Sequence, residues 1–218
     1  FRRPVLYRLA LRAGTGREFP APAALPEAGT TLPEGISVVI PTRSGRELLA
    51  TCLPPLLAQK PAEVIVVDNG SDDGTADWLA REFPGVVVEL SKEPLSFARA
   101  VNRGIARARY SHVLLLNNDM IVEPGFLSEL LRPFASVPDL FASSAQIFFP
   151  EGTRREETGK TVMLPREHPS DFTVWCNEIL PGEDHSYVLY GSGGCTLYDT
   201  RKLRQLGERV LPVAADLP

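Results

Sequence analysis

The sequence predicts an α/β fold in which a mostly parallel central sheet is flanked by helices, in a Rossmann-like arrangement. Four short apolar runs recur along the chain, within residues 36–40, 63–68, 86–90 and 113–116. Each run is followed by a segment whose apolar residues have helical spacing. The runs also lack polar alternation, which is typical of strands that are covered on both faces. Such alternation of strands and helices, with short connections, favours βαβ units and a parallel sheet.

Residues 1–35 precede this pattern and are expected to form a basic N-terminal segment followed by a linker. Arginines stand at positions 2, 3, 8, 12 and 17, and a stretch rich in proline and alanine follows them. Residues 5–12 are compatible with a short amphipathic helix that contacts a membrane surface or packs on the protein itself, or with the tail of an upstream domain. Peripheral membrane contact through this segment is one of the alternatives that the sequence leaves open.

The four strand and helix repeats lie in residues 36–125, the first half of the expected domain. The first strand should stop at Pro41, and a helix over residues 47–59 should be kinked or divided by Pro54 and Pro55. The next helices are predicted over residues 75–83 and 96–109.

The second half of the domain, residues 126–218, is less regular. A helix is predicted after Pro124, through Ser136, and an apolar segment over residues 140–149 follows. Residues 150–187 lose the pattern, and we interpret them as a long loop or irregular subdomain of the kind that often carries function. A strand at residues 195–198 and a short helix at residues 200–206 come last.

The composition narrows the range of partners. The chain has 23 basic and 27 acidic residues, a net charge of −4, so no nucleic-acid partner is expected. No apolar run reaches the roughly 20 residues of a spanning helix, and no signal-like segment is present. The three cysteines, odd in number and far apart, fit neither a disulfide framework nor a zinc site. We therefore expect reduced thiols and a cytoplasmic location, with the inner face of the membrane as the alternative.

Two of the predicted strands end in carboxylates, Asp68 and Asp119. Ligands of parallel sheets collect at the carboxyl ends of the strands. Asp68 suits a pyrimidine base or a ribose hydroxyl, because a carboxylate accepts hydrogen bonds from the donors of either group. Asp119 suits a divalent cation such as Mg²⁺ or Mn²⁺, which would neutralise the charge on a leaving diphosphate.

Both strand ends also have a simpler, structural interpretation. Asp68 would cap its own loop, in which residues 71–73 can already cap the following helix. Residues 117–119, Asn-Asn-Asp, would turn the chain, because such side chains hydrogen-bond to nearby backbone. The residues alone leave the two interpretations open.

Five motifs in order resemble the family-two glycosyltransferases, the inverting nucleotide-sugar enzymes of GT-A fold. The resemblance extends over about residues 36–206 and rests on the segments at 37–42, 64–75, 98–106, 114–119 and 194–207. The second of these reads Val-Ile-Val-Val-Asp-Asn-Gly-Ser-Asp-Asp-Gly-Thr. The triplet at 117–119 stands where the family carries its Asp-x-Asp metal motif, and is similar to that of rhamnosyltransferase-like members. The resemblance implies a GT-A fold and a role in bacterial cell-surface polysaccharide synthesis.

The resemblance also implies roles for single residues. Thr42 and Asp68 would contact the base and ribose of a UDP- or dTDP-linked sugar, Arg99 would face the diphosphate, and Asp119 would hold Mg²⁺ or Mn²⁺. The implied donor-binding residues are Pro41, Thr42, Asp68, Asn69, Arg99, Asn102, Asn117 and Asn118. Asn117 replaces the first aspartate of the usual motif, so only one direct carboxylate ligand is expected.

The expected catalytic base is Asp216. Family members place the base in an acidic pair shortly after the position of Leu206, and here a single acid reaches that region. It would deprotonate the hydroxyl of a saccharide or lipid-linked acceptor for in-line displacement at the sugar carbon. The alternative is a solvated side chain close to a terminus. Because the chain starts at Phe1 and stops at Pro218, we interpret it as a fragment, truncated at its C-terminus.

Three other functions compete with sugar transfer. The first is a non-catalytic nucleotide-sugar-binding module, or an inactive glycosyltransferase fragment, which would lack a base near the donor. The second is a dinucleotide-dependent oxidoreductase, whose glycine fingerprint should follow the first strand, where only Gly45 stands. The third is a nucleotidyltransferase, which would need a glycine-rich, basic loop at the same place.

Overall fold

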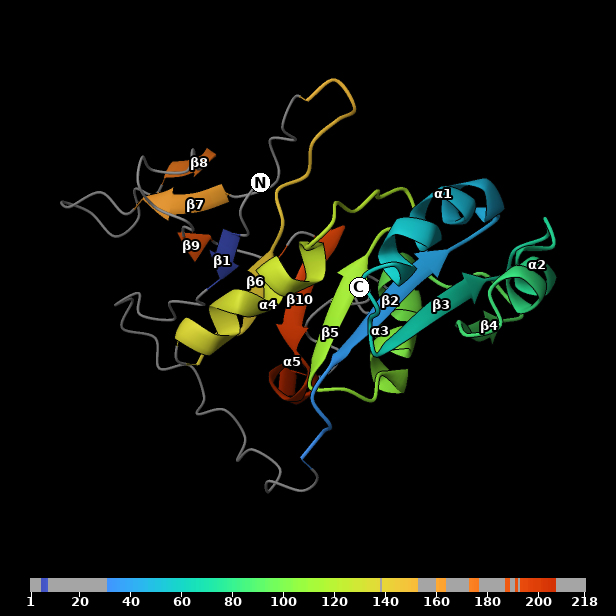
Figure 1. Cartoon of the computed structure of the whole chain (residues 1–218), viewed down its shortest axis with the longest axis horizontal. Coiled ribbons are helices and arrows are strands. Elements are labelled where there is room, and N and C mark those ends of the chain that lie inside the picture. The colour runs from blue at the N-terminus through green and yellow to red at the C-terminus, as the bar shows by residue number, and fades with distance from the viewer. Residues whose placement is uncertain are drawn as a thin grey trace, which may run out of the picture.

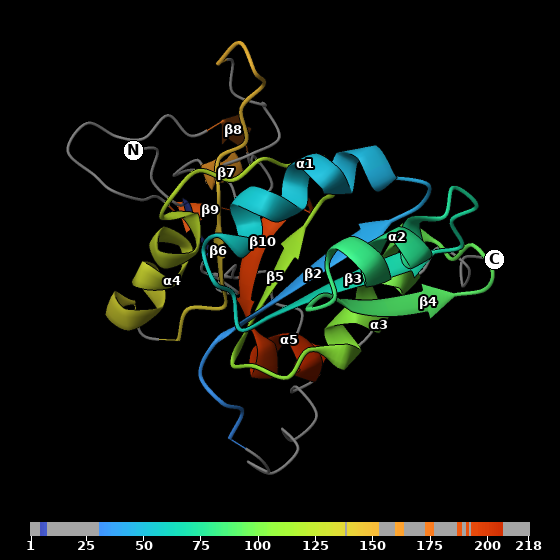
Figure 2. The same cartoon turned by 45° about the vertical axis from the view of Figure 1, so that its right-hand side comes forward.

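The computed structural model describes residues 5–7, 31–137, 139–152, 160–163, 173–176, 187–188, 191 and 193–206. The strands in these ranges form one eight-stranded sheet, in the order β4-β3-β2-β5-β10-β6-β1-β9, and a separate pair, β7 with β8 (Figure 1). Helices lie on both faces of the larger sheet (Figure 2). The predicted α/β fold with helices flanking a central sheet is confirmed.

Four neighbouring parallel strands make up the half of the sheet in which the repeats were predicted. They are β4 (Val87–Ser91), β3 (Glu63–Asn69), β2 (Ile36–Thr42) and β5 (His112–Leu116). Every residue of β2 and β3 is buried. Their continuous apolar sequences are explained by this position, because helices cover both faces of the strands.

Beyond β5 the sheet is mixed, and its next two strands are antiparallel to their neighbours. β10 (Cys195–Asp199) runs antiparallel to β5 with Cys195 opposite Leu116, and β6 (Ala142–Ser144) runs antiparallel to β10. The direction of these strands depends on how distant segments are connected across the sheet. The pattern of apolar residues in the sequence therefore does not predict it.

The N-terminal strand β1 (Val5–Tyr7) corrects the helix predicted from residue 5. It pairs antiparallel with β6 and parallel with β9 (Tyr187–Val188). These partners come from distant parts of the chain, so the local sequence does not show them. Residues 8–12 of the predicted helix lie outside the described residues.

The helices form two layers with separate cores. α1 (Arg46–Leu57), α2 (Thr75–Glu82) and α4 (Phe126–Ser136) pack on one face of the sheet, whereas α3 (Phe97–Arg107) and α5 (Thr200–Leu206) pack on the other (Figure 2). Alternate residues of each strand enter the two cores. In β2, for example, Val38 and Ile40 join the first core and Val39 joins the second.

Neither Pro41 nor the pair Pro54 and Pro55 ends the element that contains it. β2 continues through Pro41, whose register partner in β3 is Val67. The ladder with β5 ends earlier, at Val39, and a proline is tolerated where a ladder has ended. α1 likewise runs undivided through Pro54 and Pro55, which lie in its last turn.

Part of the segment predicted to be irregular forms a strand pair. β7 (Lys160–Met163) and β8 (Thr173–Cys176) are antiparallel, with Lys160 opposite Cys176. The remaining residues between 153 and 186 lie outside the described part of the chain. Among the described helices, none combines the length and the apolar character that membrane crossing requires.

Candidate active site

The carboxyl ends of β2, β3 and β5 bring three of the predicted donor-site residues to one edge of the sheet. Thr42 at the end of β2 is the register partner of Asp68 at the end of β3. Asn118, two residues after β5, donates from Nδ2 to Thr42 Oγ1 over 2.8 Å. The predicted convergence of these strand ends is therefore present in the structure.

Asp68 and Asn69 each hold a neighbouring loop. Asp68 is 1 % exposed, and its Oδ1 accepts the backbone N–H of Ser71 over 2.9 Å. Asn69 forms a two-way pair with Leu95, donating from Nδ2 to the carbonyl (2.9 Å) and accepting from the amide (2.7 Å). Gly70, with φ of +73°, packs against Pro94 of that same loop. The loop-capping alternative for Asp68 is thus present, and Asn69 fixes the loop that leads into α3.

The loops after β2 and β3 are joined by hydrogen bonds that the sequence alone did not reveal. Ser44 donates from its amide to Ser71 Oγ (2.8 Å) and from its hydroxyl to Asp72 Oδ1 (2.9 Å). Asp73 accepts the amides of Arg46 (3.3 Å) and Thr75 (3.1 Å), at the first turns of α1 and α2. One carboxylate therefore joins the starts of two helices.

The pKa of Asp73 reflects these bonds. Burial of the carboxyl works to raise its pKa, but the hydrogen bonds from the Thr75 hydroxyl and from the amides of Arg46 and Thr75 lower it below the ordinary value of 3.8. The carboxylate form is the one that these donors stabilise. The predicted capping of the second helix from residues 71–73 is confirmed for Asp73.

Gly45 makes room for the contact between Thr42 and Asn118. A Cβ at this position would meet Asn118 Nδ2 and would lie 2.5 Å from Thr42 Oγ1. In the sequence Gly45 was only the lone glycine that argued against a dinucleotide fingerprint. Its importance is steric, and it becomes visible once the ends of β2 and β5 are adjacent.

Residues 117–119 turn the chain and also present side-chain oxygens that could bind a metal ion. Asn117 donates its amide to the Gly194 carbonyl over 2.9 Å and accepts the Met120 amide, so the turn interpretation is partly correct. Among the described residues, no hydrogen-bond donor reaches the buried Asn117 Oδ1. Asp119 is exposed. The triplet therefore offers an unsatisfied amide oxygen and an accessible carboxylate.

These two oxygens could bind a hard divalent cation whose remaining coordination positions are filled by water or by a bound ligand. Mg²⁺ commonly takes one or two carboxylates together with water and substrate phosphates. The described part of the chain holds no group of three or more His, Cys, Asp or Glu side chains suited to a metal. The oxygens that the triplet offers are those of Asn117 and Asp119.

Two buried thiols near this edge are chemically inert. Burial, and then the Asp119 charge, raise the pKa of Cys52 to about 12. Burial likewise raises the pKa of Cys195 to about 12. A thiol with such a pKa is not a nucleophile at neutral pH. Cys52 and Cys195 are both free thiols, as the sequence predicted.

The two predicted donor-site residues of α3 form no hydrogen bond to the residues at the strand ends. Arg99 is exposed in the first turn of α3, and Asn102 is half-buried one turn later. Within the described residues, neither side chain hydrogen-bonds to Thr42, Asp68 or Asn118. Asp216, the predicted base, lies outside the described residues.

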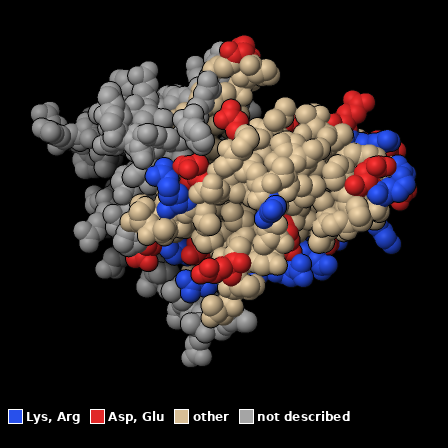
Figure 3. All heavy atoms as spheres, in the orientation of Figure 1, with Lys and Arg blue, Asp and Glu red and all other residues tan. Residues whose placement is uncertain are grey.

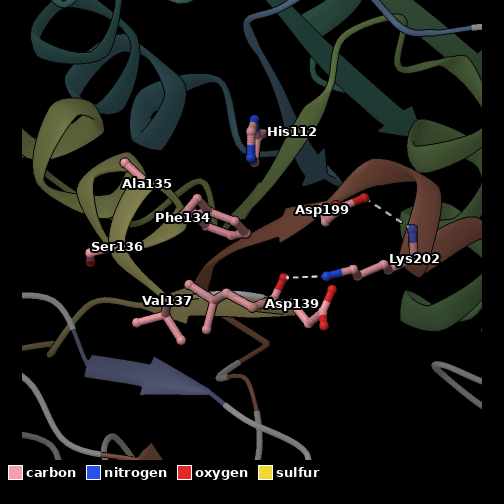
Figure 4. A pocket seen from close by; sticks show the side chains of 9 residues that line it. His112, Phe134, Ala135, Ser136, Val137, Asp139, Asp199 and Lys202 are labelled. Carbon is pink, nitrogen blue, oxygen red and sulfur yellow. Dashed lines mark hydrogen bonds between the residues drawn. The ribbon is translucent and has the colours of Figure 1, made fainter.

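A cavity of about 300 Å³ lies at the opposite, amino end of β5 (Figure 4). Two of its charged groups, Lys202 and Asp199, already hydrogen-bond within the fold. Lys202 Nζ donates to the Leu140 carbonyl over 3.0 Å, and Asp199 Oδ1 accepts the amide of Lys202 over 3.1 Å (Figure 4). The cavity is therefore separate from the candidate active site.

Comparisons with known proteins find relatives among glycosyltransferases. The family model described as glycosyl transferase family 2 matches residues 37–207, well over half of the chain. The O-antigen biosynthesis protein RfbC of Myxococcus xanthus is 31% identical over 154 residues, which are 65% of this chain and 12% of that protein. The poly-beta-1,6-N-acetyl-D-glucosamine synthase of Staphylococcus aureus (strain COL) is 29% identical over 113 residues, 50% of this chain and 27% of that protein.

The chain thus spans little more than a quarter, at most, of the length of these two relatives. Among solved structures, a mannosyltransferase from Pyrobaculum calidifontis in complex with GDP-Man and Mn²⁺ is similar with a TM-score of 0.45 and 22% identity. The similarity covers 54% of this chain and 37% of that one.

Proposed function

Since the chain belongs to glycosyl transferase family 2, we propose that it moves a sugar from a nucleoside-diphosphate sugar to a saccharide or lipid-linked acceptor, with inversion. The proposed donor carries UDP or dTDP. Residues 36–125 would supply the donor site and residues 126–218 the acceptor side. Residues 1–35 would precede this domain.

The observation that carries the proposal is the meeting of Thr42, Asp68 and Asn118 at the carboxyl edge of the parallel strands. Ligands of such sheets bind at this edge. The group combines a hydroxyl, a carboxylate and an amide, which together can pair with the donors and acceptors of a base and a ribose. Pro41 and Asn69 shape the same edge through β2 and the loop at Leu95.

Asp119 and Asn117 are the proposed ligands of Mg²⁺ or Mn²⁺. A bound cation would stabilise the negative charge that develops on the departing diphosphate. Asn118 holds Thr42 beside this position, and Arg99 would add a positive charge from the start of α3. Asn102, one turn later, would be a further polar contact on the donor side.

The proposed reaction is a single displacement. A base removes the proton of the acceptor hydroxyl, and the oxygen attacks the anomeric carbon of the donor sugar. The bond from that carbon to the diphosphate oxygen breaks, and the nucleoside diphosphate leaves with its electron pair. Asp216 is the proposed base. The second candidate is a donor-binding module, which would bind the nucleotide sugar at the same edge without a base acting on an acceptor.

Thermal unfolding of the full chain tests the donor site. UDP, dTDP and GDP are each added with Mn²⁺, with Mg²⁺ and with a chelator. A nucleotide at about a hundred times its Kd should add about 2.7 kcal/mol to the unfolding free energy, and only with metal present. Asp119→Asn should abolish the metal-dependent stabilisation by nucleotide. Asp77→Asn, on the exposed surface of α2, should leave that stabilisation unchanged.

Release of nucleoside diphosphate from UDP- or dTDP-sugars then separates an enzyme from a binding module. The transferase is supported if nucleotide binding depends on metal and if Asp216→Asn suppresses the release of nucleoside diphosphate. Binding without release supports the module. If no nucleotide shifts unfolding in a metal-dependent way, the donor-site assignment is wrong.

A further inference from the structure

The two helices on one face of the sheet carry only positive charge. α3 contains three arginines and no acidic residue, and α5 contains two arginines, one lysine and no acidic residue. The chain as a whole has four more acidic than basic residues. We call the six side chains the basic face: Arg99, Arg103, Arg107, Arg201, Lys202 and Arg204.

The helices on the other face are mixed in charge. α1 has Arg46 and Glu47, and α4 has Glu129 and Arg132. α2 has two acidic residues and one arginine. The positive charge is therefore concentrated on one side of the sheet. Figure 3 views the molecule mainly from the other face, where red and blue side chains are mixed.

Contacts in the structure hold α3 and α5 next to each other. The Arg204 guanidinium donates to the carbonyls of Ile105 (3.2 Å) and Ala108, at the end of α3. Leu203 of α5 and Val101 of α3 enter the same core. The exposed Arg107 and Arg201 thus stand on two helices in contact, whereas the cations of Lys202 and Arg204 are hydrogen-bonded to backbone carbonyls.

The arginines of α3 are spaced to lie along one side of that helix. Arg99, Arg103 and Arg107 are four residues apart, so each stands about one turn after the last. Arg103 is paired with Glu89 over 2.7 Å and keeps 42% of its side chain exposed. Among the described residues, Arg99, Arg107 and Arg201 have no ion-pair partner, and all three are exposed.

An exposed aromatic side chain stands at the start of the same helix. Phe97 is 50% exposed and precedes the arginine series. Phe97 lies on the side of α3 that carries Val101 and Gly104, which pack on the sheet, so the surface formed by the arginines is defined by charge alone. Guanidinium groups bind phosphate oxygens in pairs of hydrogen bonds, which suits a surface made of phosphate headgroups.

We propose that the basic face docks on an anionic lipid bilayer. Two adjacent helices present their cations side by side, and a bilayer offers negative charge over a comparable, extended surface. Each lysine or arginine near such a surface contributes about 1 kcal/mol, or about fivefold in partitioning. The test uses Arg107 and Arg201, which have no part in the proposed donor site, so its failure is distinguishable from failure of the proposed sugar transfer.

Vesicle cosedimentation of the full chain tests this inference. The vesicles are phosphatidylcholine alone or phosphatidylcholine with about 30% phosphatidylglycerol, at about 0.1 M and about 0.5 M salt. Binding should require phosphatidylglycerol and should weaken at high salt. The double variant Arg107→Gln/Arg201→Gln, which leaves the candidate active site intact, should partition about 25-fold more weakly.

Two further double variants control for charge and for folding. Arg81→Gln/Arg132→Gln removes the same charge from α2 and α4 on the other face, and should bind like the unmodified chain. Arg107→Lys/Arg201→Lys keeps the charge and should retain most of the binding. The inference is overturned if phosphatidylglycerol does not increase binding. It is equally overturned if Arg107→Gln/Arg201→Gln and Arg81→Gln/Arg132→Gln bind the vesicles equally well. That result would assign the membrane contact to another region, such as the N-terminal arginines.

Discussion

Glu63 is a buried carboxylate whose hydrogen bonds are all supplied by distant parts of the chain. It is 8% exposed and lies at the amino end of β3. Its Oε1 accepts the Ser37 hydroxyl (2.6 Å) and the Arg109 amide (2.7 Å), and its Oε2 accepts Arg109 Nε (3.0 Å). This residue therefore ties β2, β3 and the end of the α3 region together, at the edge opposite to the candidate active site.

Glu63→Gln should lower the free energy of unfolding by about 1–3 kcal/mol, because the new amide group cannot accept from Arg109 Nε. Chemical denaturation measures the loss. Glu89→Gln is the matched control, since the Glu89 side chain is 23% exposed, and loss of its ion pair with Arg103 should cost no more than about 1 kcal/mol. Equal losses in the two variants would contradict the role given to Glu63.

Thr42 should be important for nucleotide binding through its hydroxyl. Thr42→Val keeps the shape of the side chain but leaves Asn118 Nδ2 without its acceptor. We expect metal-dependent nucleotide affinity to fall about tenfold, equivalent to about 1.4 kcal/mol. Titration calorimetry measures the affinity, and Thr42→Ser should restore it. A valine variant with unchanged affinity would remove Thr42 from the proposed site.

At the scale of elements, Gly104 determines how closely α3 approaches the sheet. A Cβ at this position would meet Val39 Cγ1 of β2 and would lie 2.9 Å from Val67 Cγ2 of β3. Glycine inside a helix is normally unfavourable by about 1 kcal/mol relative to alanine. The close packing of the helix on the sheet explains why glycine is nevertheless present.

Gly104→Ala should therefore destabilise the protein, despite the better helix propensity of alanine. Overpacking typically costs about 1–3 kcal/mol, which exceeds the propensity gain. Gly85→Ala is the control, because no atom lies within 4 Å of a Cβ at that position. Thermal unfolding should show a lower Tm for the first variant only, and a raised Tm for Gly104→Ala would contradict the packing argument.

The elements that the sequence predicted well are those with local signals. The parallel strands at Ile36–Thr42 and His112–Leu116 and the helix at Thr200–Leu206 follow from apolar runs and helical spacing. The strand at Val5–Tyr7 was mistaken for a helix, because its stability comes from pairing with Ala142–Ser144. Strand pairing between distant segments is a tertiary property, which a short window of sequence does not contain.

The candidate site shows the same division between local and tertiary information. Asp68 and Asp119 were found because each ends an apolar run, and Thr42 followed from family resemblance. The roles of Ser44 and Gly45 emerged only from the adjacency of separate loops. Hydrogen bonds between loops leave no periodic pattern in the sequence.

At the scale of the whole molecule, the two edges of the sheet differ in chemistry. The carboxyl edge presents the exposed Asp119, whereas the amino edge holds a half-buried histidine. His112 packs edge-on against Phe134, with ring centroids 4.6 Å apart, and its Nδ1 lies 3.0 Å from Ser111 Oγ. Burial lowers the pKa of His112 below the ordinary value of 6.5, and the charges of Asp199 and Glu34 only partly oppose this.

A lowered histidine pKa makes the stability of the fold depend on pH. Between the folded and unfolded pKa values the unfolded chain binds the proton and the folded chain does not, so stability falls as pH decreases below about 6.5. His112→Phe keeps a ring against Phe134 and removes the titrating group. The carboxylate of Asp73 protonates only at lower pH, so it does not interfere in this range.

Denaturation at pH 7 and at pH 5 should therefore show a larger loss of unfolding free energy in the unmodified chain than in His112→Phe. The difference between the two losses measures the cost of placing a charged imidazole beside Phe134. Because His168 and His185 are common to both proteins, their titration cancels in this comparison. Equal losses in the two proteins would show that His112 titrates alike in the folded and unfolded chains, against the effect expected from its burial.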